Sequence, residues 1–149
     1  FEIFSINEVA TKAFKSLEKL AAEKRLKFSY EEDGALKMKG DKEEIKQVLI
    51  ILLDNAIKFT PSGYVKMQIS RESSQVKVQV ADTGIGISPK DVPHIFERFY
   101  RVYARTNPQG TGLGLAIARK IIEEHKGKIV VKSTLDEGSV FTITLPITS

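Results

Sequence analysis

Two stretches of alternating apolar and polar residues constrain the fold of this 149-residue chain most strongly. Apolar side chains occupy every second position of residues 65–69 and again of residues 76–80. Because successive side chains of a strand point to opposite faces, this period predicts two strands that each bury one face. Polar residues at the alternate positions, such as Lys66 and Gln79, predict that the other face is partly solvated.

Helical periodicity surrounds this pair of strands. Ser5 with Glu8, and Asp41 with Glu44, have the spacing of helix N-caps. The predicted helices cover residues 5–24, 41–58 and 115–124, with a short helical piece near 91–99. Further extended segments are predicted at residues 26–31, 36–38, 129–133 and 139–145. These elements predict an α/β fold, a two-layer sandwich in which a mixed, mostly antiparallel sheet packs one face on helices.

Composition narrows the class of protein. With 42% hydrophobic and 28% charged residues, the chain reads as one ordinary globular domain. The absence of cysteine excludes disulfides and thiolate metal sites. The longest apolar run, residues 48–53, is too short to cross a bilayer, which leaves a membrane anchor in a longer parent protein open. The net charge of +4 is concentrated at Arg98, Arg101 and Arg105, and we expect a local anionic ligand rather than nucleic acid.

The first polar cluster lies at the end of the second predicted helix, in the sequence Asp54-Asn55-Ala56-Ile57-Lys58. Asn55 and Lys58 are one turn apart and project together from the helix. An amide oxygen is a hard donor that can bind Mg²⁺, and a lysine beside it can hold a phosphate. The plainer interpretation is a solvated helix face with an Asp54–Lys58 ion pair. This cluster alone leaves both interpretations open.

The second cluster, Asp82-Thr83-Gly84-Ile85-Gly86-Ile87, follows a valine-rich strand directly. A carboxylate at a strand end can accept a hydrogen bond from an exocyclic amine such as that of adenine. The glycines would allow the backbone to approach a flat ring closely. A plain turn after a strand is the alternative.

The third cluster, Gln109-Gly110-Thr111-Gly112-Leu113-Gly114-Leu115, leads into the last predicted helix. Backbone amides ahead of a helix N-terminus favour phosphate oxygens. The spacing matches neither a Walker A loop nor a Rossmann fingerprint. A flexible linker is the alternative, although such linkers rarely run straight into a helix.

Together these clusters resemble the histidine-kinase branch of the ATPases that include gyrase, Hsp90 and MutL. The resemblance covers nearly the whole chain. Its motifs are an N box at residues 54–61, a G1 box at 82–86, an F box at 96–101 and a G2 box at 110–115. The order and number of these boxes make the resemblance specific, and it implies a Bergerat-type ATP-binding fold.

The resemblance also assigns roles. Asn55 would coordinate Mg²⁺, Asp82 would bind the adenine amine, Lys58 would contact phosphate and Phe59 would pack on the adenine. From an ATP lid at residues 100–109, the catalytic candidates that reach the phosphates are Arg101, Arg105 and Gln109. The remaining nucleotide contacts implied are Gly84, Gly86, Ile87, Gly110, Thr111, Gly112, Leu113, Gly114 and Leu115. Phe96 and Phe99 would pack rather than take part in the chemistry.

The activity that the resemblance implies is transfer of the γ-phosphoryl group of Mg·ATP to a histidine, in two-component signalling. The chain has no His-Glu-x-x-Arg segment; we expect His94 at the surface and His125 in a structural role near a helix C-terminus. The acceptor would lie on a separate histidine-bearing dimerisation domain, and a response regulator would be the next partner. The resemblance implies a cytoplasmic domain, monomeric in isolation.

Ile51 departs from the family pattern, because a second polar residue often stands one turn before the magnesium asparagine. Isoleucine cannot accept a proton, so hydrolysis by an activated water, as in gyrase-like ATPases, is poorly supported. Ile51 keeps one alternative open, a degenerate domain that binds nucleotide or partners without catalysis. A nucleotide-gated ATPase switch and a DNA-binding module are weaker alternatives.

Overall fold

The computed structural model describes residues 1–100 and 114–148. In chain order its elements are β1 (Glu2–Ser5), α1 (Ile6–Glu23), β2 (Lys27–Glu32), β3 (Lys37–Gly40), α2 (Lys42–Lys58), β4 (Tyr64–Glu72), β5 (Gln75–Asp82), the 3₁₀ turn η1 (Val92–His94), α3 (Gly114–Glu124), β6 (Lys128–Thr134) and β7 (Gly138–Pro146). None of the helices in these two ranges is long and apolar enough to cross a membrane.

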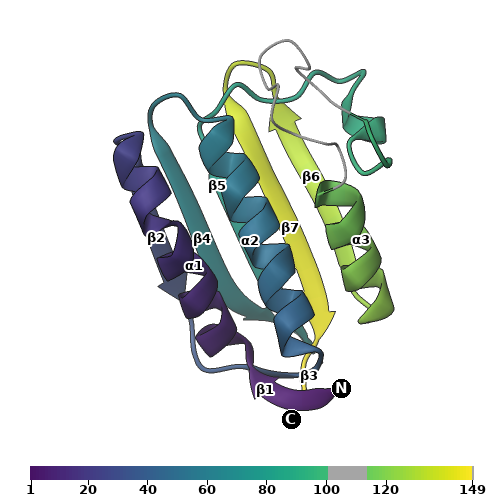
Figure 1. Ribbon diagram of the computed structural model, residues 1–149. Coiled ribbons are helices and arrows are strands. Elements are labelled where there is room, and N and C mark those ends of the chain that lie inside the picture. Colours follow the sequence, from purple (N-terminus) through teal and green to yellow (C-terminus); the bar gives the residue numbers. More distant parts are fainter. Residues whose placement is uncertain (101–113, 149) are drawn as a thin grey trace.

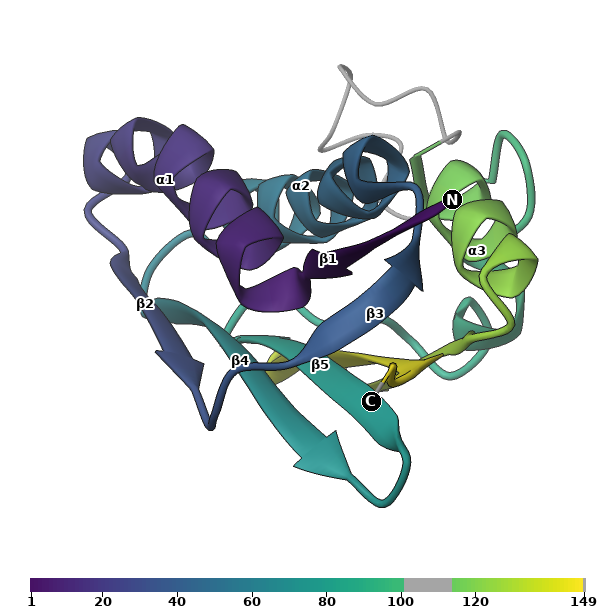
Figure 2. The ribbon, with the colours of Figure 1, turned by 90° about the horizontal axis from the view of Figure 1, so that it is seen from below.

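A five-stranded sheet with the order β2-β4-β5-β7-β6 forms one layer of the molecule. β2 pairs parallel with β4, and the other pairs are antiparallel. Helices α1, α2 and α3 lie together on one face of this sheet (Figures 1 and 2). The predicted two-layer α/β sandwich with a mixed, mostly antiparallel sheet is therefore confirmed.

The alternating pattern of β4 and β5 determines which face of the sheet meets the helices. Val65, Met67 and Ile69 of β4 are fully buried beneath them, as are the three alternating valines of β5. The outer face carries polar pairs instead, such as Lys66 with Glu31 at 3.3 Å. The sequence prediction that only one face is buried is confirmed.

Helices α1 and α2 begin where their caps predict. The Ser5 hydroxyl accepts a hydrogen bond from the Glu8 amide at 3.3 Å, and the Asp41 carboxylate accepts from the amides of Glu43 and Glu44 at 3.1 Å. Each side chain thereby satisfies amides that have no partner within the helix.

Two segments differ from the sequence prediction. β1 was not predicted, because a four-residue strand shows too little periodicity; it pairs antiparallel with β3 in a small separate sheet. Residues 91–99 were predicted to be helical, but only η1 forms there. Side-chain contacts organise this stretch instead, since Tyr100 donates to Asp91 and the His94 ring contacts Glu97 at 2.7 Å.

His125 joins the end of α3 to the start of α2. Only 4% of the residue is exposed. Its Nδ1 lies 2.7 Å from the Ile121 carbonyl oxygen, and its Nε2 accepts a hydrogen bond from the Asp41 amide at 3.0 Å. These partners assign a neutral ring with the proton on Nδ1. The expected structural role is present, although not as the cation that a helix C-terminus favours. His94 lies at the surface, as expected.

Candidate functional site

The residues of the first two clusters meet at one end of the sheet, where α2 ends and β5 ends (Figure 1). The Phe59 carbonyl oxygen, at the C-cap of α2, accepts a hydrogen bond from the Ile85 amide at 3.0 Å. The loop after β5 is therefore held directly against the end of α2. The sequence clusters at 54–58 and 82–87 therefore lie beside each other in the fold.

Asp82, the last residue of β5, is half-buried at this junction. Its carboxylate accepts a hydrogen bond from the Gly84 amide at 2.8 Å, and the Ser139 amide also favours its charged form. Burial nevertheless raises the pKa of Asp82 above its ordinary value, and the two amide donors only partly offset this effect. The carboxylate therefore offers hydrogen-bond acceptor oxygens in a partly dehydrated position. An amine group of a ligand can donate to an acceptor of this kind.

The fold itself explains why positions 84 and 86 of this loop are glycine. A Cβ on Gly84 would lie 2.3 Å from the Phe59 carbonyl oxygen, and one on Gly86 would lie 2.1 Å from the Thr134 carbonyl oxygen. Gly86 also has a φ of +72°, which side-chain-bearing residues rarely adopt. The fold itself requires both glycines, in addition to the close ligand approach that the sequence suggested.

Ile87 ends the loop by turning inward. It is 9% exposed, and its amide donates to the Ser133 hydroxyl at 2.8 Å. The Ser133 and Ser139 hydroxyls lie 2.7 Å apart, and the Asp136 amide donates to the Ile85 carbonyl oxygen at 2.8 Å. The loop is therefore fixed between α2 and the β6–β7 turn.

Asn55 lies in the last turn of α2 and is half-buried. Among the described residues no side-chain hydrogen bond engages its amide, so the amide oxygen is open to a ligand. No group of three or more His, Cys, Asp or Glu side chains in the described part of the chain could hold a metal. A single amide oxygen fits Mg²⁺, which keeps several waters and takes its remaining ligands from substrate phosphates.

Lys58 forms the ion pair that the plainer interpretation of its cluster predicts. Its Nζ lies 2.9 Å from Asp54 Oδ2, and 37% of the lysine side chain is exposed. A half-exposed pair of this kind is weak. The ammonium group therefore remains available to a phosphate, and that role stays a prediction. Phe59, the C-cap residue, is half-buried, and its packing on a purine likewise stays a prediction.

The start of α3 completes this end of the molecule. A Cβ on Gly114 would lie 3.4 Å from Cγ2 of Ile51, one turn before Asn55 on α2. The apolar side chain that breaks the family pattern therefore packs at the α2–α3 contact, and Leu115 is partly buried against the core. The predicted Arg101, Arg105, Gln109, Gly110, Thr111, Gly112 and Leu113 lie outside the described residues.

The two phenylalanines of the F box differ in how they pack. Phe96 packs edge-on against Phe141 with ring centroids 6.2 Å apart, as expected. Phe99 is 65% exposed, so the expectation that it packs is not met among the described residues. Arg98 lies 5.9 Å from the centroid of the Phe99 ring instead.

Sequence reasoning missed several residues that shape the site. Ser139 and Thr60 were not singled out, and Lys24 was read only as the end of α1. The Lys24 ammonium donates to the carbonyl oxygens of Ile57 and Lys58, at 2.6 and 3.1 Å, and so caps α2. Each of these contacts joins segments far apart in sequence, and no local pattern signals them.

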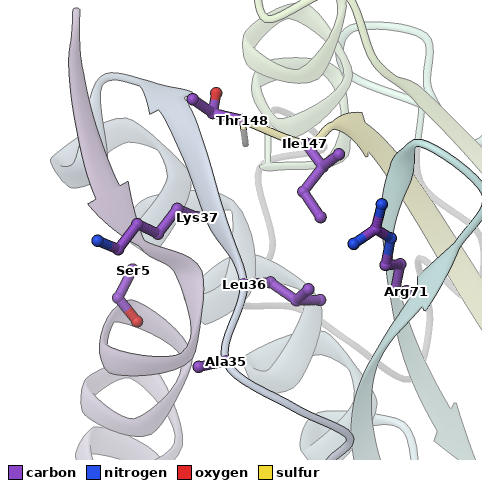
Figure 3. A pocket seen from close by; sticks show the side chains of 7 residues that line it. All are labelled: Ser5, Ala35, Leu36, Lys37, Arg71, Ile147 and Thr148. Carbon is purple, nitrogen blue, oxygen red and sulfur yellow. The ribbon is translucent and has the colours of Figure 1, made fainter.

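A cavity of about 250 Å³ lies elsewhere, lined by Ser5, Ala35, Leu36, Lys37, Arg71, Ile147 and Thr148 (Figure 3). Arg71 pairs with Val76 at one end of the β4–β5 ladder, whereas Asp82 pairs with Val65 at the other. The two places are thus roughly 20 Å apart along the strands. This cavity is separate from the candidate site.

Comparison with known proteins agrees with this geometry. Residues 40–149 match the family model of histidine kinase-, DNA gyrase B- and HSP90-like ATPases. The chain is 36% identical over 149 residues to the circadian input-output histidine kinase CikA of Synechococcus elongatus, covering 96% of this chain and 20% of CikA. The chain thus spans about a fifth of that relative.

Solved structures show the same architecture. The nucleotide-free catalytic domain of histidine kinase ThkA superposes with a TM-score of 0.87 and 35% identity, over 98% of this chain and 95% of that one. Full-length ShkA in complex with AMPPNP gives 0.85 and 27%, over 98% of this chain and 31% of ShkA. This chain therefore belongs to the family of histidine kinase-, DNA gyrase B- and HSP90-like ATPases, as an ATP-binding catalytic domain of the sensor histidine kinase type.

Proposed function

We propose that this domain binds Mg·ATP where α2, β5 and α3 meet, and transfers its γ-phosphoryl group to a histidine of a separate dimerisation domain in two-component signalling. One observation carries the proposal: the Phe59–Ile85 hydrogen bond joins the Asn55 helix to the Asp82 loop. The Ile51–Gly114 contact brings the start of α3 to the same helix. The proposed purine acceptor, the proposed magnesium ligand and the N-terminus of α3 are thus adjacent.

The chain's own residues would mainly position the nucleotide and neutralise the charge of its phosphates. Phosphoryl transfer depends chiefly on these two effects. Asp82 would accept a hydrogen bond from the adenine amine, and Phe59 would pack on the ring. Asn55 would hold Mg²⁺, which when bound neutralises phosphate charge, and Lys58 would contact a phosphate. Arg101, Arg105 and Gln109 are proposed to reach the β- and γ-phosphates. The acceptor histidine and a response regulator would be the partners of this domain.

Ile51 bears on a second candidate, a domain that binds nucleotide without catalysis. Its side chain packs at the start of α3 and offers no proton acceptor. This arrangement disfavours direct hydrolysis of ATP by an activated water. Transfer to a histidine does not require a proton acceptor at Ile51, because the nucleophile would come from the other domain.

Two measurements test the proposal. Isothermal titration of the domain with Mg·ATP should show binding in the wild type and loss of at least about tenfold in affinity in Asn55→Ala and Asp82→Ala. Mixing the domain with the histidine-bearing domain of its parent kinase and γ-labelled ATP should then label that domain. Binding without labelling would favour the non-catalytic candidate, and fast hydrolysis by the isolated domain would favour an ATPase switch.

A further inference from the structure

The hydroxyl of Thr60 lies buried in the candidate site. Thr60 is fully buried, and its Oγ1 has no hydrogen-bond partner among the described residues. Buried hydroxyls are almost always hydrogen-bonded, so each exception calls for an explanation such as a water or a ligand-bound state. This group is not part of the roles assigned above.

Thr60 occupies its position for local reasons. It follows the C-cap residue Phe59, and Pro61 after it disfavours a helical backbone, so α2 cannot continue. The chain turns here, and the Thr60 amide donates to the Ile57 carbonyl oxygen at 3.3 Å. The side chain is thereby directed into the junction between α2 and the loop after β5.

Thr60 Oγ1 and two acceptor oxygens lie around one point beside Gly84. The position that a Cβ on Gly84 would occupy lies 2.8 Å from Thr60 Oγ1, 2.9 Å from Asp82 Oδ1 and 2.3 Å from the Phe59 carbonyl oxygen. The Phe59 oxygen already accepts from the Ile85 amide. A hydroxyl can donate, whereas a carboxylate only accepts. The Asp82 carboxylate is thus the natural acceptor for the Thr60 proton, directly or through one enclosed water.

We propose that Thr60 is a positioning residue for purine recognition. Its hydroxyl donates to the Asp82 carboxylate in the nucleotide-bound state and orients it, so that a carboxylate oxygen faces an exocyclic 6-amino group. The proposal rests on the proposed function, because it takes Asp82 as the group that reads the purine. It adds a specificity role: without this donor, Asp82 distinguishes a 6-amino purine from a 6-oxo purine less sharply.

Titration calorimetry with Mg·ATP and Mg·ITP, which differ at the 6-position of the purine, tests the role. Thr60→Val removes the hydroxyl and keeps the shape, and Thr60→Ser keeps the hydroxyl. We expect Thr60→Val to weaken ATP binding roughly three- to tenfold while ITP binding changes little, so that the ATP/ITP preference shrinks. Thr60→Ser should retain the preference of the wild type. If Thr60→Val does not fold, Thr60→Ala serves the same comparison.

A merely structural hydroxyl would behave differently. Removing an unpartnered buried hydroxyl should raise the melting temperature and leave both affinities unchanged, and that result would overturn the proposal. An equal loss of ATP and ITP binding would also overturn it, because it would show a general distortion of the loop. A wild type that binds neither nucleotide would refute the proposed function itself, and this inference with it.

Discussion

The Phe59 carbonyl oxygen accepts the Ile85 amide at 3.0 Å, and Gly84 lies directly beside this hydrogen bond. This hydrogen bond connects the end of α2 to the loop after β5, two segments separated in the chain by β4 and β5. Both segments belong to the candidate site. The contact leaves no space for a side chain on Gly84, and this lack of space can be tested.

Gly84→Ala should therefore destabilise the fold, because its Cβ would lie 2.3 Å from a backbone oxygen that cannot rotate away. We expect a loss of about 1–3 kcal/mol in the free energy of unfolding, measured by urea denaturation. Gly114→Ala is the matched control: among the described residues its Cβ would meet only the Ile51 methyl group at 3.4 Å, and the change should stay within about 0.5 kcal/mol. Equal effects of the two substitutions would contradict this explanation.

The half-buried carboxylate of Asp82 should lower the stability of the fold at pH 7. A carboxyl whose folded-state pKa is raised by burial contributes stability below its unfolded-state pKa, and loses that contribution as the pH rises through the folded-state pKa. Asp82→Asn removes this loss. Its melting temperature at pH 7 should therefore be at least that of the wild type, and the difference should shrink as the pH falls towards about 4.

The same variant should bind Mg·ATP at least about tenfold more weakly at pH 7, because a charge-assisted acceptor is lost. Melting curves and titrations on one preparation measure both effects. A clearly lower melting temperature for Asp82→Asn at pH 7 would mean that the favourable effect of the Gly84 and Ser139 amides on the charged carboxylate outweighs its burial.

If Lys58 contacts a phosphate, as proposed, Asp54 competes with that phosphate for the Lys58 ammonium group. Asp54→Asn should change the free energy of unfolding by less than about 0.5 kcal/mol, since the pair is half-exposed. It should raise the affinity for Mg·ATP roughly two- to threefold if Lys58 contacts phosphate. Glu123→Gln, which breaks the similar Arg119–Glu123 pair of α3, should leave the affinity unchanged. Weaker binding by Asp54→Asn would argue against the role proposed for Lys58.

Gly40 and His125 should be energetically coupled. A Cβ on Gly40 would lie 2.4 Å from Cδ2 of the buried His125 ring and 2.7 Å from its Nε2. Gly40→Ala and His125→Ala should each destabilise the fold by about 2–3 kcal/mol, the first by overpacking and the second by leaving the Asp41 amide without its partner.

The double variant has room for the new methyl group, so its destabilisation should fall short of the sum of the single effects by about 1 kcal/mol or more. Urea unfolding of the four proteins measures this coupling. Additive effects would show that the contact between Gly40 and the ring can relax without cost.

Local patterns predicted the layers of the fold, because each long element carries its own period and its own cap. Ser5 and Asp41 begin helices as expected, and the buried positions of β4 follow the alternation of its residues. β1 escaped prediction because it is short and pairs with β3, a strand more than thirty residues along the chain. Residues 91–99 did not become a regular helix because side-chain pairs such as Asp91–Tyr100 hold them in another conformation.

For the candidate site, residue types in the motifs pointed to Asn55, Asp82 and the glycines, but not to the contacts that connect them. The sequence suggested that Gly84 and Gly86 admit a ligand, whereas the fold shows that neighbouring backbone already requires both. Thr60 gave no signal, because a threonine after a helix is unremarkable until its burial is known. Such contacts depend on tertiary packing, which no local period encodes.

The meeting of α2 and α3 has an electrostatic consequence. The last turn of α2, which carries Asn55, and the first residue of α3, Gly114, lie at the same end of the domain (Figure 1). Peptide dipoles place partial negative charge at the end of α2 and partial positive charge at the start of α3. A cation is therefore favoured beside Asn55 and an anion beside Gly114, while the Lys24 ammonium moderates the negative pole. The backbone dipoles alone would thus favour the proposed Mg²⁺ at the end of α2 and the proposed phosphate at the start of α3.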